Sequence, residues 1–253
     1  MINFGNDSKK SAHEVSKNLY FFSENAMLDC NIYCIVDPDT KEIALFDTGN
    51  GKTLNGLFEG LKDLKLDYNN IGKIFITHEH VDHVLGLYPI MEKMKYNPPE
   101  IFAYGETASI LKKGEENKIF PGNLGIPASM FGVEIVPLKI SDLTNEKEVN
   151  FSEFNFQIFY TPGHSLGSIC YYEPDKKILI PGDVVFRRDR MWNVGSFGRY
   201  DFPGGSLETL KKSIAFINDL DVNILLPGHM GIVTSQANQD ISLALKTINT
   251  LKY

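Results

Sequence analysis

Residues Thr77-His78-Glu79-His80-Val81-Asp82-His83 are the most informative stretch of this 253-residue chain. The chain has six histidines, and three of them fall within these seven positions, interleaved with Asp82. Imidazole and carboxylate groups are common protein ligands of divalent transition metals. The stretch therefore predicts a metal site.

The residues around this stretch predict how the ligands are presented. Residues 73–77 are mostly apolar and rich in β-forming types, which predicts a buried strand that ends where the histidines begin. Alternate side chains of an extended chain share a face, which brings His78 and His80 together. Asp82 suits the first turn of a following helix, and that turn directs Asp82 and His83 toward the same point.

Three later tripeptides repeat one pattern, in which Pro-Gly precedes a metal-binding residue after an apolar, strand-like run. They are Pro162-Gly163-His164, Pro181-Gly182-Asp183 and Pro227-Gly228-His229. Because proline stops a strand ladder and glycine permits a tight turn, each tripeptide should present one ligand at the end of a strand. Five of the six histidines then belong to one set, and the sixth, His13, lies in a polar stretch where we expect it to be solvated.

In this order the motifs resemble those of the metallo-β-lactamase fold superfamily, from about residue 18 to the C-terminus. Phe46-Asp47-Thr48-Gly49 resembles the early Asp-Thr-Gly turn of that family. Residues 198–206, GRYDFPGGS, resemble a segment of glyoxalase II-like hydrolases and persulfide dioxygenases. The resemblance implies an α/β (α+β) fold, a four-layer αββα sandwich in which helices flank two mixed β-sheets.

The resemblance also implies a role for each candidate ligand. One metal would be held by His78, His80 and His164, a second by Asp82, His83 and His229, and Asp183 would bridge both. Asp82 and Asp183, together with a metal-bound hydroxide, would be the catalytic groups. Asp47 is similar to an acid that orients ligands without touching the metal. A purely structural zinc site usually has about four ligands, often with cysteine, so seven candidates without cysteine fit two open metals better.

The implied function is that of a metal-dependent hydrolase, a glyoxalase II-like thioesterase that uses a hydroxide bridging two metals. Metal coordination lowers the pKa of water from about 15.7 to about 7, which provides a nucleophile at neutral pH. The expected cofactors are two divalent ions, zinc in the first place, with iron or manganese as alternatives. Only about one helix of chain follows His229, where glyoxalase II has a glutathione-binding domain, so lactones and other esters stay open as substrates.

The main alternative is a mononuclear iron persulfide dioxygenase. Such enzymes resemble the chain in the Gly-Arg-x-Asp-Phe segment, and they hold a single iron with residues that match His78, His164 and Asp183. Ligand counting cannot separate one metal from two, because these enzymes keep the other histidines too. A decayed, non-enzymatic module is disfavoured because no ligand is missing.

Composition narrows the classes of partner. The net charge is −7, from 25 basic and 32 acidic residues, which disfavours nucleic acid because binding to phosphates needs dense Lys and Arg. Neither a signal peptide nor a membrane-spanning run is evident, so we expect a cytoplasmic protein with a small-molecule substrate and no membrane partner. A homo-oligomer is left open. The three cysteines give no disulfide framework, and Cys30 and Cys34 are predicted to be buried thiols.

Residues that follow Asp183 supply candidates for substrate contact. They are Arg187, Arg188, Trp192 and Arg199. An arginine near the metals could meet a carboxylate or phosphate of the substrate, although basic runs are more often solvated loops. Trp192 and the residues after it could form a wall of the substrate pocket.

We expect one domain over residues 1–253, with an N-terminal extension over about residues 1–17 and a loop insertion at 114–132. The insertion could be a wall or lid of the substrate pocket, a surface feature or a subunit contact. Hydrophobic periodicity predicts the remaining elements. Strands are expected near 19–24, 30–37, 42–47, 100–104, 133–138, 154–161, 168–173, 177–182 and 223–226, and helices near 53–64, 106–113, 206–218 and 237–250.

Overall fold

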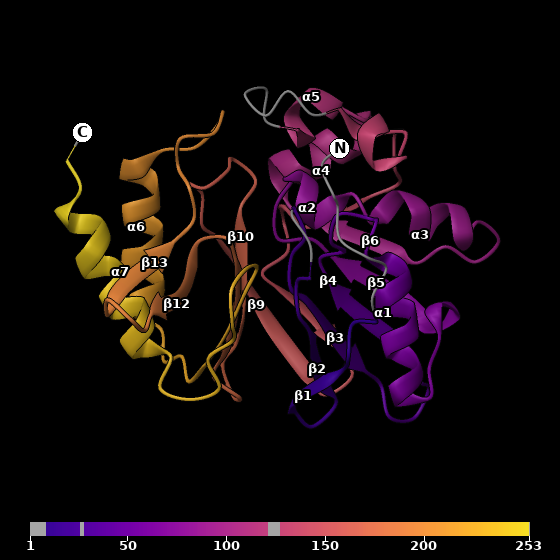
Figure 1. Cartoon of the computed structure of the whole chain (residues 1–253), viewed down its shortest axis with the longest axis horizontal. Coiled ribbons are helices and arrows are strands. Elements are labelled where there is room, and N and C mark those ends of the chain that lie inside the picture. Colours follow the sequence, from indigo (N-terminus) through magenta and orange to yellow (C-terminus); the bar gives the residue numbers. More distant parts are fainter. Residues whose placement is uncertain (1–8, 26–27, 121–126, 253) are drawn as a thin grey trace. The chain divides into compact units, whose positions relative to one another are not determined.

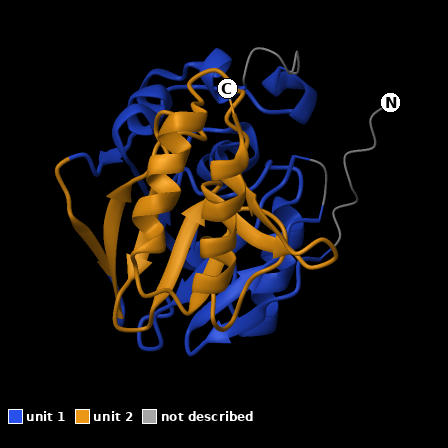
Figure 2. Cartoon of the chain, turned by 90° about the vertical axis from the view of Figure 1, so that its left-hand side faces the viewer, with its two compact units in different colours: residues 1–144, 151–153 blue, residues 145–150, 154–253 orange. Residues whose placement is uncertain are grey.

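The computed structural model of the chain describes residues 9–25, 28–120 and 127–252, which form two compact units (Figure 1, Figure 2). Unit 1 comprises Met1–Thr144 and Phe151–Glu153, and unit 2 comprises Asn145–Asn150 and Phe154–Tyr253. Each unit has a mixed β-sheet and its own helices.

Unit 1 contains a seven-stranded sheet whose strands follow one another in chain order. The strands are β1 (His13–Ser16), β2 (Leu19–Phe22), β3 (Ile32–Val36), β4 (Ile43–Phe46), β5 (Ile71–Phe75), β6 (Glu100–Ala103) and β7 (Ser141–Asp142). The pairs from β1 to β4 are antiparallel, and those from β4 to β7 are parallel. The carboxyl ends of β4 and β5 therefore lie at the same edge of the sheet, where the metal motif begins.

The helices of unit 1 bury apolar faces in the core that they share with this sheet. They are α1 (Leu54–Leu61), α2 (Val81–Val84), α3 (Leu87–Lys93), α4 (Gly105–Lys113) and α5 (Glu116–Ile119), with short 3-10 turns η1 (Lys62–Leu64), η2 (Tyr68–Asn70) and η3 (Ala128–Phe131). On α1 the buried residues Leu54, Leu57, Phe58 and Leu61 follow the predicted i, i+3, i+4, i+7 spacing. The amphipathic pattern thus places α1 on the sheet.

Unit 2 contains a five-stranded sheet in the order β14-β11-β10-β9-β8 and a separate two-stranded ribbon. The strands are β8 (Glu148–Phe151), β9 (Phe154–Tyr160), β10 (Ile169–Glu173), β11 (Ile178–Gly182), β12 (Val185–Asp189), β13 (Val194–Phe197) and β14 (Ile224–Pro227). Only the β11–β14 pair of the five-stranded sheet is parallel among those whose register is described.

Two helices of unit 2, α6 (Leu207–Asn218) and α7 (Asn238–Thr250), run side by side (Figure 1). Their buried faces share one apolar core with β10 and β11. The Ser206 hydroxyl caps α6 by accepting a hydrogen bond from the Thr209 N–H at 3.2 Å. The GRYDFPGGS segment therefore ends in a helix cap.

The predicted α/β class with two mixed sheets and helices is confirmed. The prediction of a strand at 133–138 is wrong, because this segment forms no strand. Pro137 cannot donate to a strand ladder, and the N–H of Leu138 donates to the Leu111 carbonyl at the end of α4. The strands β1, β7, β8, β12 and β13 were not predicted, and the helix expected after Asp82 is interrupted between α2 and α3.

The described part of the expected N-terminal extension belongs to unit 1. The strand β1 pairs with β2, and the Lys10 side chain is fully buried. His13 is exposed, as expected for a solvated residue. In the predicted insertion, α5 and η3 are helical, while residues 121–126 lie outside the described residues.

The predictions for the cysteines are confirmed, since all three are buried free thiols. Burial raises the pKa of the Cys170 thiol to about 12 and that of Cys34 further still. Among the described residues, no helix is both long and apolar enough to cross a membrane.

Candidate functional site

Three imidazole rings of the metal motif lie together in unit 1, just beyond the end of β5. The ring of His78 lies 4.8 Å from that of His80 and 4.0 Å from that of His83, measured between centroids. All three side chains are buried. Asp82 lies in the first turn of α2 and is half-buried. The predicted clustering of His78 with His80 at the end of this strand is thus seen within unit 1.

Hydrogen bonds orient two of these rings through the buried carboxylate of Asp47. The Nδ1 atom of His83 lies 2.8 Å from Asp47 Oδ2, and the Thr77 hydroxyl donates to the same oxygen at 2.8 Å. Thr77 Oγ1 is in turn 3.0 Å from Nδ1 of His78. Because the Thr77 proton is directed to Asp47, its oxygen accepts from His78. Both imidazoles then carry a proton on Nδ1 and a lone pair on Nε2.

The Asp-Thr-Gly turn holds the backbone of the motif as well as its rings. Asp47 adopts a left-handed conformation with φ of +60°, and its Oδ1 accepts the Thr77 N–H at 2.9 Å. The N–H and the hydroxyl of Thr48 both donate to the His83 carbonyl at 2.9 Å. A Cβ on Gly86 would lie 2.1 Å from the Thr48 carbonyl oxygen, so the two backbones are in direct contact. The turn therefore clamps the end of α2.

A buried ion pair supports this turn from the other side. The Lys10 ammonium lies 2.6 Å from Asp29 Oδ2, and neither side chain is exposed. Asp29 Oδ1 also accepts from the Thr53 hydroxyl at 3.0 Å. At Gly49, where φ is +69°, a Cβ would meet Asp29 Oδ1 at 2.5 Å. This pair could not be predicted from the sequence, because neither residue belongs to a motif and the partners lie on separate segments.

Cys30 is a further neighbour that the sequence did not connect to the motif. Potential ligand atoms of Cys30, Asp47 and His83 all lie within 4.8 Å of one another, and all three residues are buried. Burial raises the pKa of the Cys30 thiol to about 11, an effect that His83 partly offsets. Cys30 is therefore a neutral thiol packed beside the orienting carboxylate, consistent with the prediction of a core thiol.

In unit 2, the three Pro-Gly turns bring His164, Asp183 and His229 together. Asp183 Oδ2 lies 3.5 Å from His164 Nε2 and 3.2 Å from His229 Nε2. Gly182, with φ of +53°, accepts a backbone hydrogen bond from Gly228 at 2.8 Å, which ties the turn after β11 to the turn after β14. His229 is more open than the other two, with 22% of its side chain exposed. Each turn thus places its histidine or aspartate just beyond the end of a strand, and the three side chains lie close together within one unit.

The segment 198–206 orients His164 through its backbone. Nδ1 of His164 lies 2.7 Å from the Arg199 carbonyl oxygen. Since a carbonyl can only accept, Nδ1 carries the proton and Nε2, which faces Asp183, carries the lone pair. A Cβ on Gly198 would lie 1.9 Å from the Asp183 carbonyl oxygen and 2.9 Å from His164 Nδ1. The glycine therefore permits its own backbone to approach the backbone of Asp183 and the ring of His164 closely.

The four residues proposed for substrate contact differ in their surroundings. Arg188 is held by Asp240 of α7, which accepts its backbone N–H at 2.8 Å. Arg199 forms two hydrogen bonds with Asp201 and lies over the Phe202 ring, at 4.3 Å from the centroid. Trp192 is 74% exposed between β12 and β13. The guanidinium of Arg187 lies against Gly231, two residues beyond His229 in the chain.

The donor set of each unit fits a divalent metal. Nδ1 of His78, His83 and His164 is engaged by an acceptor, so each ring has its Nε2 lone pair to offer to a metal. Imidazole and carboxylate suit zinc, iron and manganese. A model of the metallo-beta-lactamase superfamily matches residues 27–229, a range that includes all seven candidate ligands.

The chain belongs to the metallo-beta-lactamase superfamily. It is 30% identical over 191 residues to the probable metallo-hydrolase YqgX of Bacillus subtilis (strain 168), covering 74% of this chain and 77% of YqgX. It is also 30% identical over 207 residues to the hydroxyacylglutathione hydrolase GloC of Haemophilus influenzae, covering 79% of this chain and 85% of GloC.

A solved structure supports the same fold. The crystal structure of the B3 metallo-beta-lactamase BLEG-1 matches with a TM-score of 0.68 at 25% sequence identity, over 93% of this chain and 100% of BLEG-1. The predicted superfamily and its fold class are thus confirmed, and the chain is a metallo-hydrolase of the metallo-beta-lactamase superfamily.

Gly198→Ala should lower metal affinity in this metallo-beta-lactamase fold, because a methyl group 1.9 Å from the Asp183 carbonyl must displace the backbone beside His164 and Asp183. We expect at least about a tenfold loss, as for other residues that orient metal ligands, measured by competition with a chromophoric chelator. Gly72→Ala is the control, since its Cβ meets only the flexible side chain of Glu42. Unchanged metal affinity in Gly198→Ala would show that the close packing of Gly198 against Asp183 and His164 does not position the candidate ligands.

Asp47→Asn tests whether orientation of the candidate ligands matters, because it keeps every candidate ligand and changes only the group that orients them. The amide cannot accept from Thr77 and His83 as the carboxylate does, so the proton on His83 Nδ1 loses its charged acceptor. We expect metal affinity about 10- to 100-fold lower, with folding checked by circular dichroism. The exposed residue Asp219 provides the control Asp219→Asn. A variant with wild-type affinity would show that Asp47 serves only the turn.

Proposed function

We propose that the chain is a hydrolase of thioesters or related esters that uses two divalent metal ions, with zinc as the expected metal. His78, His80 and His164 would hold one ion, Asp82, His83 and His229 the other, and Asp183 both. The observation that carries this proposal is the orientation of the rings, since hydrogen bonds fix the proton of three histidines on Nδ1 in the two units. A small-molecule substrate is the expected partner.

The orienting groups explain why these histidines would bind metal at neutral pH. Each Nδ1 proton is held by an acceptor, namely a hydroxyl oxygen, a carboxylate or a carbonyl, so the neutral ring keeps its Nε2 lone pair. Asp183 adds a negative charge beside two imidazoles. A negatively charged ligand set of this kind stabilises bound cations, and its carboxylate can accept a proton from a water molecule during hydrolysis.

Bound divalent metals supply a water of lowered pKa and a Lewis acid for the carbonyl of the substrate. The chain itself contributes the orientation of the ligands and the positive charge of Arg187 beside the turn of His229. We propose that this guanidinium binds a carboxylate or phosphate of the substrate, because Arg188 and Arg199 already have acidic partners.

The proposal of a thioester substrate is supported by the likeness to GloC, whose name describes a hydroxyacylglutathione hydrolase. A thiolate is a good leaving group, and sulfur is a soft ligand suited to zinc. The second candidate is a persulfide dioxygenase with one iron. It is favoured by the segment Gly198-Arg199-Tyr200-Asp201-Phe202, in which the Arg199 side chain pairs with Asp201 and stacks on Phe202.

The experiment that tests the function combines elemental analysis with a substrate panel. We expect two equivalents of divalent metal per chain, and hydrolysis of an acylglutathione thioester or of a lactone detected by release of thiol or acid. One equivalent of iron, with oxygen uptake and sulfite formation from glutathione persulfide, would overturn the hydrolase proposal in favour of the dioxygenase. Absence of bound metal after reconstitution would overturn both.

Asp183→Asn should remove at least one metal equivalent and reduce turnover to the background rate, because the amide has no charge to offer beside His164 and His229. Metal content is measured by mass spectrometry and turnover with the substrate found in the panel. Asp175→Asn changes an exposed carboxylate of the same unit and should retain both properties. Activity of Asp183→Asn near the wild-type rate would refute the role assigned to Asp183.

A further inference from the structure

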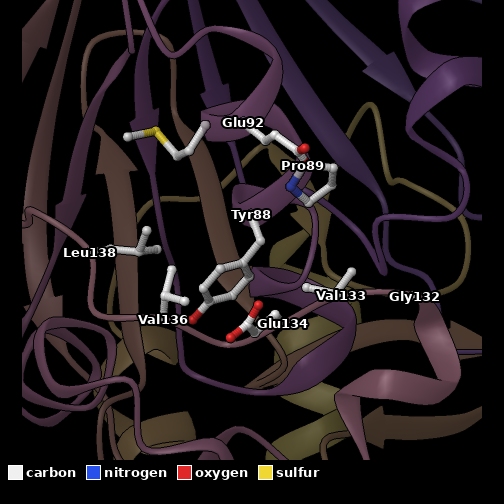
Figure 3. Close-up of a pocket in the computed structure, with 9 residues that line it drawn as sticks. Tyr88, Pro89, Glu92, Gly132, Val133, Glu134, Val136 and Leu138 are labelled. Atoms are coloured by element: carbon white, nitrogen blue, oxygen red, sulfur yellow. The ribbon is translucent and has the colours of Figure 1, made fainter.

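Carboxylates of unit 1 occur both at its surface and in its interior. Glu92 and Glu134 are exposed and line a cavity of about 430 Å³ between α3 and residues 132–138 (Figure 3). Glu79, in contrast, is only 5% exposed, and the histidines on either side of it are candidate metal ligands. Burying a carboxylate is costly unless the group is hydrogen-bonded, so Glu79 needs a partner inside the unit.

The partner of Glu79 lies in the first turn of α4. The fully buried hydroxyl of Thr107 donates a hydrogen bond to Glu79 Oε2 at 2.8 Å. Thr107 is the third residue of α4 (Gly105–Lys113). Because the first turn of a helix carries a partial positive charge, a carboxylate is stabilised there. The hydrogen bond therefore joins the metal motif of residues 77–83 to α4, and both belong to unit 1.

Glu79 does not share the face of the motif that carries the imidazole rings. The ring centroids of His78 and His80 are 4.8 Å apart, whereas the Glu79 carboxylate belongs to none of the clusters of potential metal ligands that the described residues form. His80 has an extended backbone, with φ of −68° and ψ of 151°, and successive side chains of an extended segment alternate between faces. Rotation about the backbone of Glu79 would turn the two histidines relative to each other, and the bond to Thr107 restricts this rotation.

We propose that Glu79 is a positioning residue for the metal ion assigned to His78 and His80, and that its hydrogen bond to Thr107 preorganises these two ligands. This inference rests on the proposed metal site. Ligands whose backbone is already fixed lose less conformational freedom when the ion binds, and this raises the affinity for the ion. Glu79 itself touches neither the ion nor the substrate.

The second ion, assigned to Asp82 and His83, should not depend on Glu79. Both residues lie in α2, and the N–H and the hydroxyl of Thr48 hold the carbonyl of His83. These contacts do not involve Thr107. Loss of the hydrogen bond between Glu79 and Thr107 should therefore weaken the binding of one ion, whereas a general loosening of unit 1 would weaken both.

The test compares two substitutions of Thr107. Thr107→Val removes the hydroxyl and nearly retains the size of the side chain, whereas Thr107→Ser retains the hydroxyl. Binding of Zn²⁺ to the full-length protein is measured by stepwise competition with a chromophoric chelator, and the step weakened by Asp82→Asn is assigned to the second ion. We expect Thr107→Val to weaken the other step at least about threefold, as for loss of one hydrogen bond, and Thr107→Ser to restore it.

Substitutions of Glu79 test the other partner. Glu79→Ala should weaken the same step at least about tenfold, as for other residues that position metal ligands. Glu79→Gln should weaken it less, because the amide oxygen still accepts from Thr107. Thr144→Val is the control, since Thr144 Oγ1 accepts the Gly105 N–H at 3.1 Å, also at the start of α4, and should leave both steps unchanged. Melting of the metal-free proteins shows that each variant is folded.

The outcomes separate this inference from the proposed function. Unchanged Zn²⁺ affinity in a folded Thr107→Val, or an equal loss at both steps, would overturn the role of Glu79 and leave the proposed metal site standing. A Thr107→Ser variant as weak as Thr107→Val would overturn it too. A wild-type protein that binds no Zn²⁺ would overturn the proposed function, and this inference with it.

Discussion

The carboxylate of Asp47 is the group on which the metal motif of unit 1 depends. It accepts hydrogen bonds from the N–H and the hydroxyl of Thr77 and from the imidazole of His83. A buried carboxylate is stable only when such donors surround it. The donors therefore stabilise the carboxylate of Asp47, and the carboxylate in turn fixes the orientation of Thr77 and His83. This network extends to His78 through the oxygen of Thr77.

In unit 2 a backbone carbonyl, and not a carboxylate, orients the histidine. The carbonyl of Arg199 fixes the ring of His164, and the hydrogen bond between Gly182 and Gly228 ties two ligand-bearing turns together. Backbone atoms can come this close only because Gly198 has no side chain. The two units thus illustrate two ways to fix the tautomer of a histidine, one by a buried charge and one by close backbone contact.

Much of this arrangement could be predicted from the sequence, because the ligands lie directly after strands. Apolar runs and Pro-Gly turns locate the ends of β9, β11 and β14, and hence His164, Asp183 and His229. The amphipathic spacing of α1 was equally clear. Prediction from local pattern failed where pairing between distant segments decides the structure, as in the short strands β1 and β8. It also failed at residues 133–138, which have a β-like composition but contain Pro137 and form no strand.

The residues that support the ligands were harder to predict than the ligands themselves. Thr48 and Thr77 lie inside or beside recognisable motifs, but their hydrogen bonds to His83 and Asp47 depend on the parallel pairing of β4 with β5. Arg199 was named for its guanidinium, and the contact of its carbonyl with His164 was not predicted. A sequence states which side chains are present, whereas backbone acceptors become visible only in three dimensions.

The fully buried pair of Lys10 and Asp29 has a practical consequence for anyone who trims the chain. Proteolysis or a shortened expression vector that removed Lys10 would leave the buried carboxylate of Asp29 without its cation, next to Gly49 of the turn that carries Asp47. An affinity tag placed at the amino end should therefore leave this lysine in place. Lys10 lies in the segment that was expected to be an N-terminal extension, yet it stabilises the carboxylate next to the Asp-Thr-Gly turn.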